Sequence, residues 1–145
     1  MLYDRAKRVV KVTDFGLSRL SDLIPSKRLT PGVVTRYYRA PEVLFESLYS
    51  YPVDIWSLGC IFYELCTNKV CFPGDCQIDQ IMRIFRVLGT PTFEEIGYQY
   101  GINPPMFPKR DDLREIFPNL GLSMEGYDLL GKMLTYNPAK RITAS

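Results

Sequence analysis

The chain has 145 residues, of which 46% are hydrophobic and 23% charged, and its formal net charge is +2 at pH 7. This composition is typical of one globular domain and excludes a fibre or a disordered tail, while the small charge argues against a nucleic-acid-binding surface. No apolar window reaches the roughly 18 residues of a membrane span, and the N-terminus lacks a signal-peptide run. We therefore expect an intracellular protein, cytoplasmic or nuclear, with neither nucleic acid nor a membrane as partner.

The first 39 residues predict a short hairpin and a long loop. Residues 2–12 place two apolar runs, "LY" and "VVKV", on either side of the charged "DRAKR", which is typical of two strands and a turn. Residues 17–39 are polar, basic and proline-containing, without a clean period. A loop of that length is usually functional or disordered.

Two helices are predicted next. Proline at position 52 with an acid nearby opens a helix, and residues 53–65 are apolar on every face, so we expect this helix to be buried. Residues 76–89 carry apolar side chains at helical spacing, and Gly89 and Pro91 are stop signals. This second segment is expected to be an amphipathic surface helix.

The four cysteines of this region are expected to be free thiols. They form no CxxC pair, and the chain has no histidine to complete a metal site. The first two fall among the packing residues of the predicted buried helix. The cysteines are Cys60, Cys66, Cys71 and Cys76.

The C-terminal part predicts an irregular insert and a third helix. Residues 91–118 contain five prolines interleaved with aromatic residues, which excludes a long continuous helix. Ser123 is expected to cap a helix that stops by Pro138. The predicted fold is therefore mainly α, with one small hairpin.

Four motifs follow one another along the chain: "DFG" at 14–16, "YYRAPE" at 37–42, "VDIWSLGCIFYEL" at 53–65 and "NPAKR" at 137–141. This order resembles the C-terminal lobe of eukaryotic protein kinases from the metal-binding turn onward. The resemblance covers nearly the whole chain. It implies that residues 1–145 are one partial kinase domain with an activation segment, a central helix, surface helices and a group-specific insert.

Within the kinases, "VVTRYYRAPEV" and "GDCQIDQIMRIFRVLGTP" resemble the group of cyclin-dependent and MAP kinases. The second stretch and "YNPAKRI" are more similar to the cyclin-dependent branch. Arg36 departs from that branch, which usually carries leucine there, and is similar to a MAP-kinase residue. The insert at 91–118 lies where the whole group carries its extra segment.

The resemblance implies a nucleotide site at the first motif. Asp14 matches the carboxylate that chelates the magnesium ion bridging the phosphates of ATP, because a hard cation needs an anionic oxygen ligand. Phe15 and Gly16 complete the motif, which favours this role over that of an ordinary turn acid. ATP and Mg²⁺ are therefore the cofactors expected for the whole kinase, and neither is expected to bind well to this chain alone.

The resemblance also implies a phosphorylated activation loop. Thr30 corresponds to the threonine that activating kinases phosphorylate, and a phosphate there would add nearly two negative charges to a basic loop. Arg19 would be one of the arginines that clamp this phosphate through a planar fork. The alternative for both residues is a solvated loop without such a role.

Val34 and Arg39 match the pair that shapes the pocket for the substrate residue after the phosphorylated one. In the family this pocket favours proline, whose nitrogen carries no hydrogen. Thr35 matches the residue whose hydroxyl bonds the catalytic aspartate. The expected partners are thus proteins with Ser-Pro or Thr-Pro sequences, and a cyclin-like activator for the whole protein.

Three further residues match structural positions of the kinase lobe. Glu42 and Arg141, far apart in the chain, correspond to an acid and an arginine that pair to tie the activation segment to later helices. Asp54 corresponds to the helix acid that holds the catalytic loop through its backbone.

The stretch "MLYDRAKRVVKVTDFG" matches the kinase region that begins at the asparagine ending the catalytic loop, HRDLKPxN. The N-terminal lobe and the catalytic aspartate are then expected to lie outside these residues, so this chain alone is expected to be inactive. Three interpretations stay open. The chain is a piece of a serine/threonine kinase, a short protein that uses the kinase lobe as a binding module or decoy, or a degenerate product.

Overall fold

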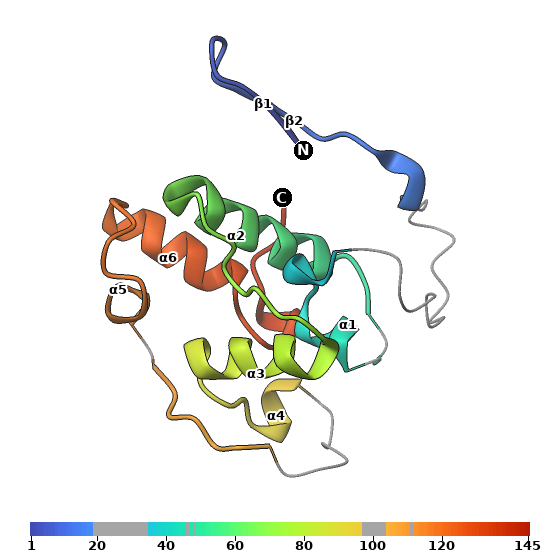
Figure 1. Cartoon of the computed structure of the whole chain (residues 1–145), viewed down its shortest axis with the longest axis vertical. Helices are drawn as coiled ribbons and strands as arrows, with labels where there is room; N and C mark the ends of the chain where they lie inside the picture. The colour runs from blue at the N-terminus through green and yellow to red at the C-terminus, as the bar shows by residue number, and fades with distance from the viewer. Residues whose placement is uncertain (19–34, 46, 48, 97–103, 111) are drawn as a thin grey trace.

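The protein is described by a computed structural model that covers residues 1–18, 35–45, 47, 49–96, 104–110 and 112–145 (Figure 1). The described elements are one hairpin and a set of helices. Helix α2 (Pro52–Thr67) packs against α6 (Met124–Met133), and α3 (Gln77–Leu88) packs against α1 (Pro41–Leu44). Among the described residues, no helix is long and apolar enough to cross a membrane.

The hairpin confirms the prediction for residues 2–12. Strands β1 (Leu2–Asp4) and β2 (Val9–Lys11) pair antiparallel, with Tyr3 opposite Val10. In the turn, the Lys7 backbone N–H donates to the Asp4 carboxylate at 3.1 Å. All residues of both strands are exposed, so the hairpin contributes little to the core.

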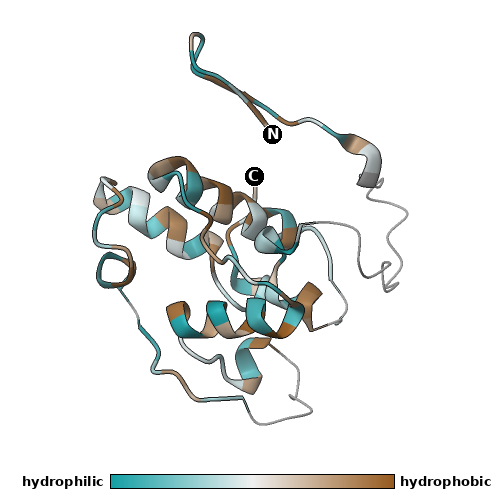
Figure 2. Ribbon diagram, in the orientation of Figure 1, coloured by the Kyte–Doolittle hydropathy of each residue, from teal (hydrophilic) through white to brown (hydrophobic). Residues whose placement is uncertain are grey.

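Helix α2 lies at the centre of the described elements, as predicted, but its burial is one-sided. It begins with a proline in its first turn, and its C-cap residue Asn68 adopts the left-handed conformation that asparagine tolerates. Only Trp56, Gly59 and Cys60 of this helix are buried, and Leu65 is 56% exposed. The face turned away from the core is therefore apolar and incompletely covered, and Figure 2 shows hydrophobic residues along this helix.

Helix α3 confirms the second predicted helix and its stop signal. The Cys76 sulfur accepts from the Asp79 N–H at 3.4 Å and so caps the first turn. At the other end, Gly89 has φ +86°, and a Cβ there would lie 2.6 Å from the Lys109 Cα. A residue with a side chain would therefore clash with the insert as well as strain the backbone.

The insert contains only short helices among its described residues, α4 (Phe93–Ile96) and α5 (Leu113–Ile116), which agrees with the exclusion of a long helix. The third predicted helix is α6. Its cap is the predicted one, since the Ser123 hydroxyl accepts from the Gly126 N–H at 3.3 Å. A 3-10 helix (Pro138–Lys140) follows it.

An aromatic cluster forms the core where α2, α3 and the segment after α6 meet. The ring of Trp56 lies 6.0 Å from that of Phe72 and 6.2 Å from that of Tyr136, and Phe85 meets Tyr136 edge-on at 6.2 Å. The Tyr136 hydroxyl donates to the Gly89 carbonyl at 2.7 Å. This cluster joins residues distant in sequence into one core.

The thiols provide a test of this packing. All four cysteines are free, as predicted, with Cys60 and Cys71 buried and Cys76 exposed. Burial raises the pKa of Cys60 from 9.0 to about 12 and also raises the pKa of Cys71. Because the thiolate is the nucleophile, the raised pKa leaves a smaller reactive fraction of Cys60 at mildly alkaline pH than an exposed thiol would have.

We therefore expect a thiol reagent to label Cys76 first, and Cys60 and Cys71 only after unfolding. Peptide mapping of the labelled protein in buffer and in urea measures this order. Labelling of Cys60 in buffer at the rate of Cys76 would contradict the packing of α2.

Candidate functional site

The turn at residues 14–16 carries the predicted metal ligand. Asp14 has φ 64° and ψ 75°, a left-handed conformation that short polar residues tolerate. Its carboxylate accepts from the Gly16 N–H at 3.4 Å and caps the 3-10 helix η1 (Phe15–Leu17). Asp14 is exposed, and Phe15 is 66% exposed. The carboxylate is thus accessible to an ion.

The Asp14 carboxylate can supply one ligand of a magnesium ion, and the other ligands would have to come from a nucleotide and water. The described residues contain no group of three or more histidine, cysteine or acidic side chains that could hold a metal ion. Magnesium is usually bound by one or two carboxylates, with phosphate oxygens and waters as its other ligands. Asp14 matches one such carboxylate, and the residues that the structure describes do not form a complete metal site by themselves.

The turn after Thr35 is fixed to α2 by side-chain hydrogen bonds. Thr35 is exposed and precedes the 3-10 helix η3 (Arg36–Tyr38). The Ser57 hydroxyl donates to the Tyr38 carbonyl at 2.7 Å, and the Tyr38 hydroxyl donates to the Glu64 carboxylate at 2.7 Å. Burial and then the bond to Glu64 raise the pKa of Tyr38 to about 12, so the phenol stays protonated at neutral pH.

The same turn is fixed from its other side by the region around α3. The Gln80 side chain is fully buried, donates to the Tyr37 carbonyl at 3.4 Å and accepts from the Gly74 N–H at 2.9 Å. The Arg36 guanidinium donates to the Asp75 carbonyl. Residues 36–38 are therefore held between two helices, which defines the backbone leading to half-buried Arg39.

A buried ion pair joins Glu42 and Arg141, which lie 99 residues apart in the chain. The Arg141 guanidinium donates to both oxygens of Glu42, at 2.7 and 3.0 Å, and their side chains are 0% and 6% exposed. Its remaining N–H groups donate to the carbonyls of Pro52, Thr135 and Tyr136. All five donors of the guanidinium thus have an acceptor, which a buried charge requires.

This pair also contacts the aromatic core. The Arg141 guanidinium lies 5.3 Å from the centre of the Trp56 ring, within the range of a cation–π interaction. Glu42 lies in the first turn of α1, where an acid is favoured by the helix dipole. The pair therefore ties α1, α2 and the segment after α6 together.

The other predicted site residues are not part of this network. Asp54 is exposed in the first turn of α2. Arg19, Thr30 and Val34 lie outside the described residues, so their predicted roles stay predictions. The structure brings together Glu42 and Arg141, places Thr35 and Arg39 at the two ends of the η3 turn, and leaves Asp14 at a separate exposed turn.

A family model of the protein kinase domain matches residues 1–145. The chain belongs to the protein kinase family. The match confirms the resemblance to protein kinases, and the mainly helical fold with its small hairpin is consistent with part of a kinase C-terminal lobe.

The side chains that fix the η3 turn in this kinase chain were not among the residues predicted from the sequence. The position of Gln80 predicts its burial. It lies four residues before Ile84 and eight before Leu88, on the buried face of α3. A polar residue on an apolar helix face usually has a buried partner. Ser57 and Arg36 had no comparable signal, because their acceptors are backbone carbonyls elsewhere in the chain.

Proposed function

We propose that this chain is part of a proline-directed serine/threonine kinase of the cyclin-dependent type, which transfers the γ-phosphate of ATP to protein hydroxyl groups. The observation that supports this best is the η3 turn, held from α2 by Ser57 and from α3 by Gln80. A substrate pocket must keep its shape to discriminate between residues. A turn fixed from two sides meets this requirement.

The chain's own residues would position the reactants. Asp14 would hold a magnesium ion against the nucleotide phosphates, and the ion would neutralise charge on the transferred group. The Thr35 hydroxyl would orient the catalytic aspartate. Val34 and Arg39 would form the pocket that favours proline after the acceptor residue, and Arg19 would bind a phosphate on Thr30.

The catalytic aspartate and the strand lysine would be supplied by kinase residues other than those of this chain, so we propose that the chain alone does not transfer phosphate. A cyclin-like protein is the activator that we propose for the whole kinase. A second candidate function, a non-catalytic binding module, is supported by the incompletely covered apolar face of α2.

The proposal can be tested with a chimera. The N-terminal part of the chimera would come from an active cyclin-dependent kinase, up to the asparagine of its HRDLKPxN motif, and would be joined to residue 2 of this chain. The last helices of the same cyclin-dependent kinase would follow residue 145. We expect the chimera to phosphorylate a Ser-Pro peptide in a radiolabel assay. Asp14→Asn should remove that activity, and Asp128→Asn, on the exposed surface of α6, should not. A stably folded chimera without activity would contradict the assignment.

In the same chimera, Thr30→Ala is expected to lower activity by at least about tenfold, because the basic activation loop would lose the phosphate that orders it. Mass spectrometry of the active protein should find phosphate on Thr30. Unchanged activity of Thr30→Ala in phosphorylated preparations would exclude Thr30 as the activating site.

A further inference from the structure

The start of α3 contacts the η3 turn at two successive residues. The Arg36 guanidinium donates to the Asp75 carbonyl, and the Gln80 side-chain amide donates to the Tyr37 carbonyl at 3.4 Å. Asp75 lies just before α3 and Gln80 lies in its first turn. One short stretch of chain therefore holds the turn through one side chain of its own and one side chain of the turn.

Gln80 also binds the segment that precedes its own helix. Its side-chain oxygen accepts from the Gly74 N–H at 2.9 Å. A carbonyl can only accept and a backbone N–H can only donate, so a side chain that joins the two needs both a donor and an acceptor, which an amide has. Gln80 is fully buried, and its loss would deprive two backbone groups of this partner. The residue thus links the backbone of Gly74 to that of Tyr37.

The Gly74 end of this link is fixed by close packing. A Cβ on Gly74 would lie 2.5 Å from the Gln80 Cα and 2.5 Å from its side-chain oxygen, so only glycine leaves room for this contact. Two residues earlier, Phe72 is fully buried and stacks on Trp56, with ring centres 6.0 Å apart. The segment that Gln80 binds is therefore packed into the aromatic core, and it restricts where the amide can lie.

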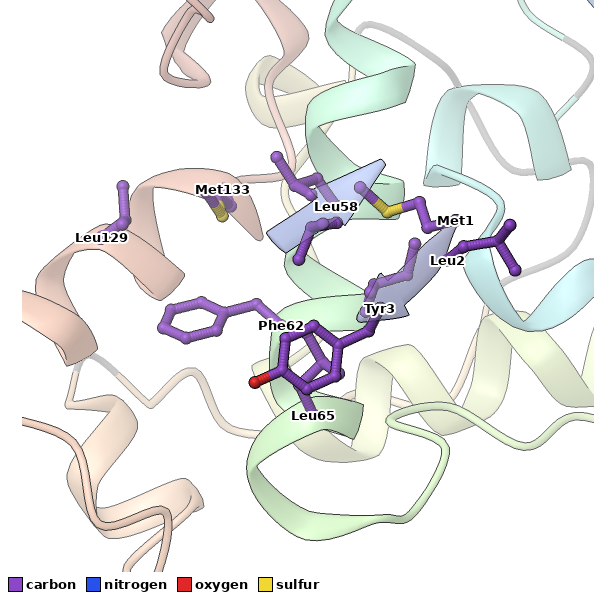
Figure 3. A pocket seen from close by; sticks show the side chains of 10 residues that line it. Met1, Leu2, Tyr3, Leu58, Phe62, Leu65, Leu129 and Met133 are labelled. Carbon is purple, nitrogen blue, oxygen red and sulfur yellow. The ribbon is translucent and has the colours of Figure 1, made fainter. Parts of the chain in front are cut away.

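The Asp75 end is fixed by hydrogen bonds within the first turns of α3. The Asp79 carboxylate accepts from the Asp75 N–H at 3.0 Å and from the Arg83 guanidinium at 2.7 Å. These bonds orient the peptide backbone at Asp75, whose carbonyl is the acceptor for Arg36. None of the residues that join α3 to the turn lines the apolar cavity between the hairpin, α2 and α6 (Figure 3). A change in them is therefore expected to leave that face unaltered.

We propose that Gln80 is a positioning residue for the substrate pocket. Through the Tyr37 carbonyl it sets the backbone that leads to Arg39, and so it sets how tightly the substrate residue after the acceptor is bound. Because Gln80 is fully buried, it acts through the turn and does not contact the substrate itself. Arg36 is the second link of the same kind. This inference rests on the proposed function, which places the pocket beside the η3 turn.

The first measurement uses the 145-residue chain and needs no catalysis. The Arg39 N–H donates to the Arg36 carbonyl at 3.0 Å and closes the turn. Gln80→Met keeps the size of the side chain and removes both amide bonds, so the Arg39 amide should exchange its hydrogen at least about threefold faster. Gln77→Met is the matched control, because Gln77 lies on the same helix but donates to the Leu44 carbonyl at 2.6 Å. It should leave this exchange rate unchanged.

The second measurement uses the kinase chimera. Gln80→Met should raise the KM for the Ser-Pro peptide by about three- to tenfold and leave the KM for ATP unchanged, because binding of the peptide alone is weakened. A merely structural role would lower the fraction of active enzyme, and hence kcat, at an unchanged peptide KM. Arg36→Met removes the other link at a half-buried position and should raise the same KM. This variant decides the test if Gln80→Met does not fold.

Two results would overturn the inference. One is an Arg39 amide that exchanges at the same rate with and without the Gln80 side chain, which would show that Gln80 does not hold the turn. The other is an unchanged peptide KM in both Gln80→Met and Arg36→Met, which would leave the proposed function standing. A chimera that does not distinguish Ser-Pro from Ser-Ala peptides would instead contradict the proposed specificity, while a raised peptide KM in Gln80→Met would still support the role of Gln80.

Discussion

Incubated with ATP, magnesium and a Ser-Pro peptide, the purified 145-residue chain is expected to transfer no phosphate above a no-enzyme control. Phosphoryl transfer depends on positioning and on charge stabilisation by several groups at once. Of the groups that the kinase resemblance implies, Asp14 is the one proposed magnesium ligand in this sequence, and it lies at an exposed turn. Loss of several such groups lowers the rate by many orders of magnitude and is not additive.

A contaminating kinase is the main source of error in this measurement, and Asp14→Asn is its control. Residual activity that persists in Asp14→Asn comes from a contaminant. Activity that Asp14→Asn removes would mean that these residues bind and turn over ATP by themselves, and the proposal of an inactive chain would be wrong.

Arg141→Met is expected to lower the free energy of unfolding by about 3–5 kcal/mol, or to unfold the chain altogether. The substitution leaves the buried Glu42 carboxylate without its partner and removes donors from three backbone carbonyls. It also removes the cation from the face of Trp56. Urea unfolding followed by tryptophan fluorescence measures the change, because Trp56 is the single tryptophan of the chain.

Lys132→Met is the matched control, since it breaks an exposed ion pair with Asp128 on α6. Its cost should be at most about 0.5 kcal/mol, as for other surface pairs. Combining Arg141→Met with Glu42→Met should recover part of the lost stability, because no buried charge then stays unpaired. A cost for Arg141→Met as small as that of the control would show that the pair does not hold the lobe together.

The sequence predicts the elements whose signals are local. Ser123 caps α6 and Gly89 ends α3 as expected, since a cap depends on a few adjacent residues. The hairpin is found because its charged turn separates two apolar runs. Helix α1 has no such signal, because a helix of four residues is too short to show a period.

Contacts between distant segments could not be derived from local patterns. Glu42 and Arg141 were paired only through the resemblance to kinases, because nothing within either segment indicates the other. The same applies to Arg36, which bonds the carbonyl of Asp75. Hydropathy also overestimated the burial of α2: its residues are apolar on every face, but described elements cover only one side.

The proposed kinase would select a proline after the acceptor residue. This selectivity is measured as the kcat/KM of the chimera for a Ser-Pro peptide relative to that for the matched Ser-Ala peptide. We expect a ratio of at least about tenfold, because the pocket formed with Val34 and Arg39 would disfavour a residue that offers a backbone N–H. Equal values of kcat/KM for the two peptides, in a chimera that is active and depends on Asp14, would contradict the claim.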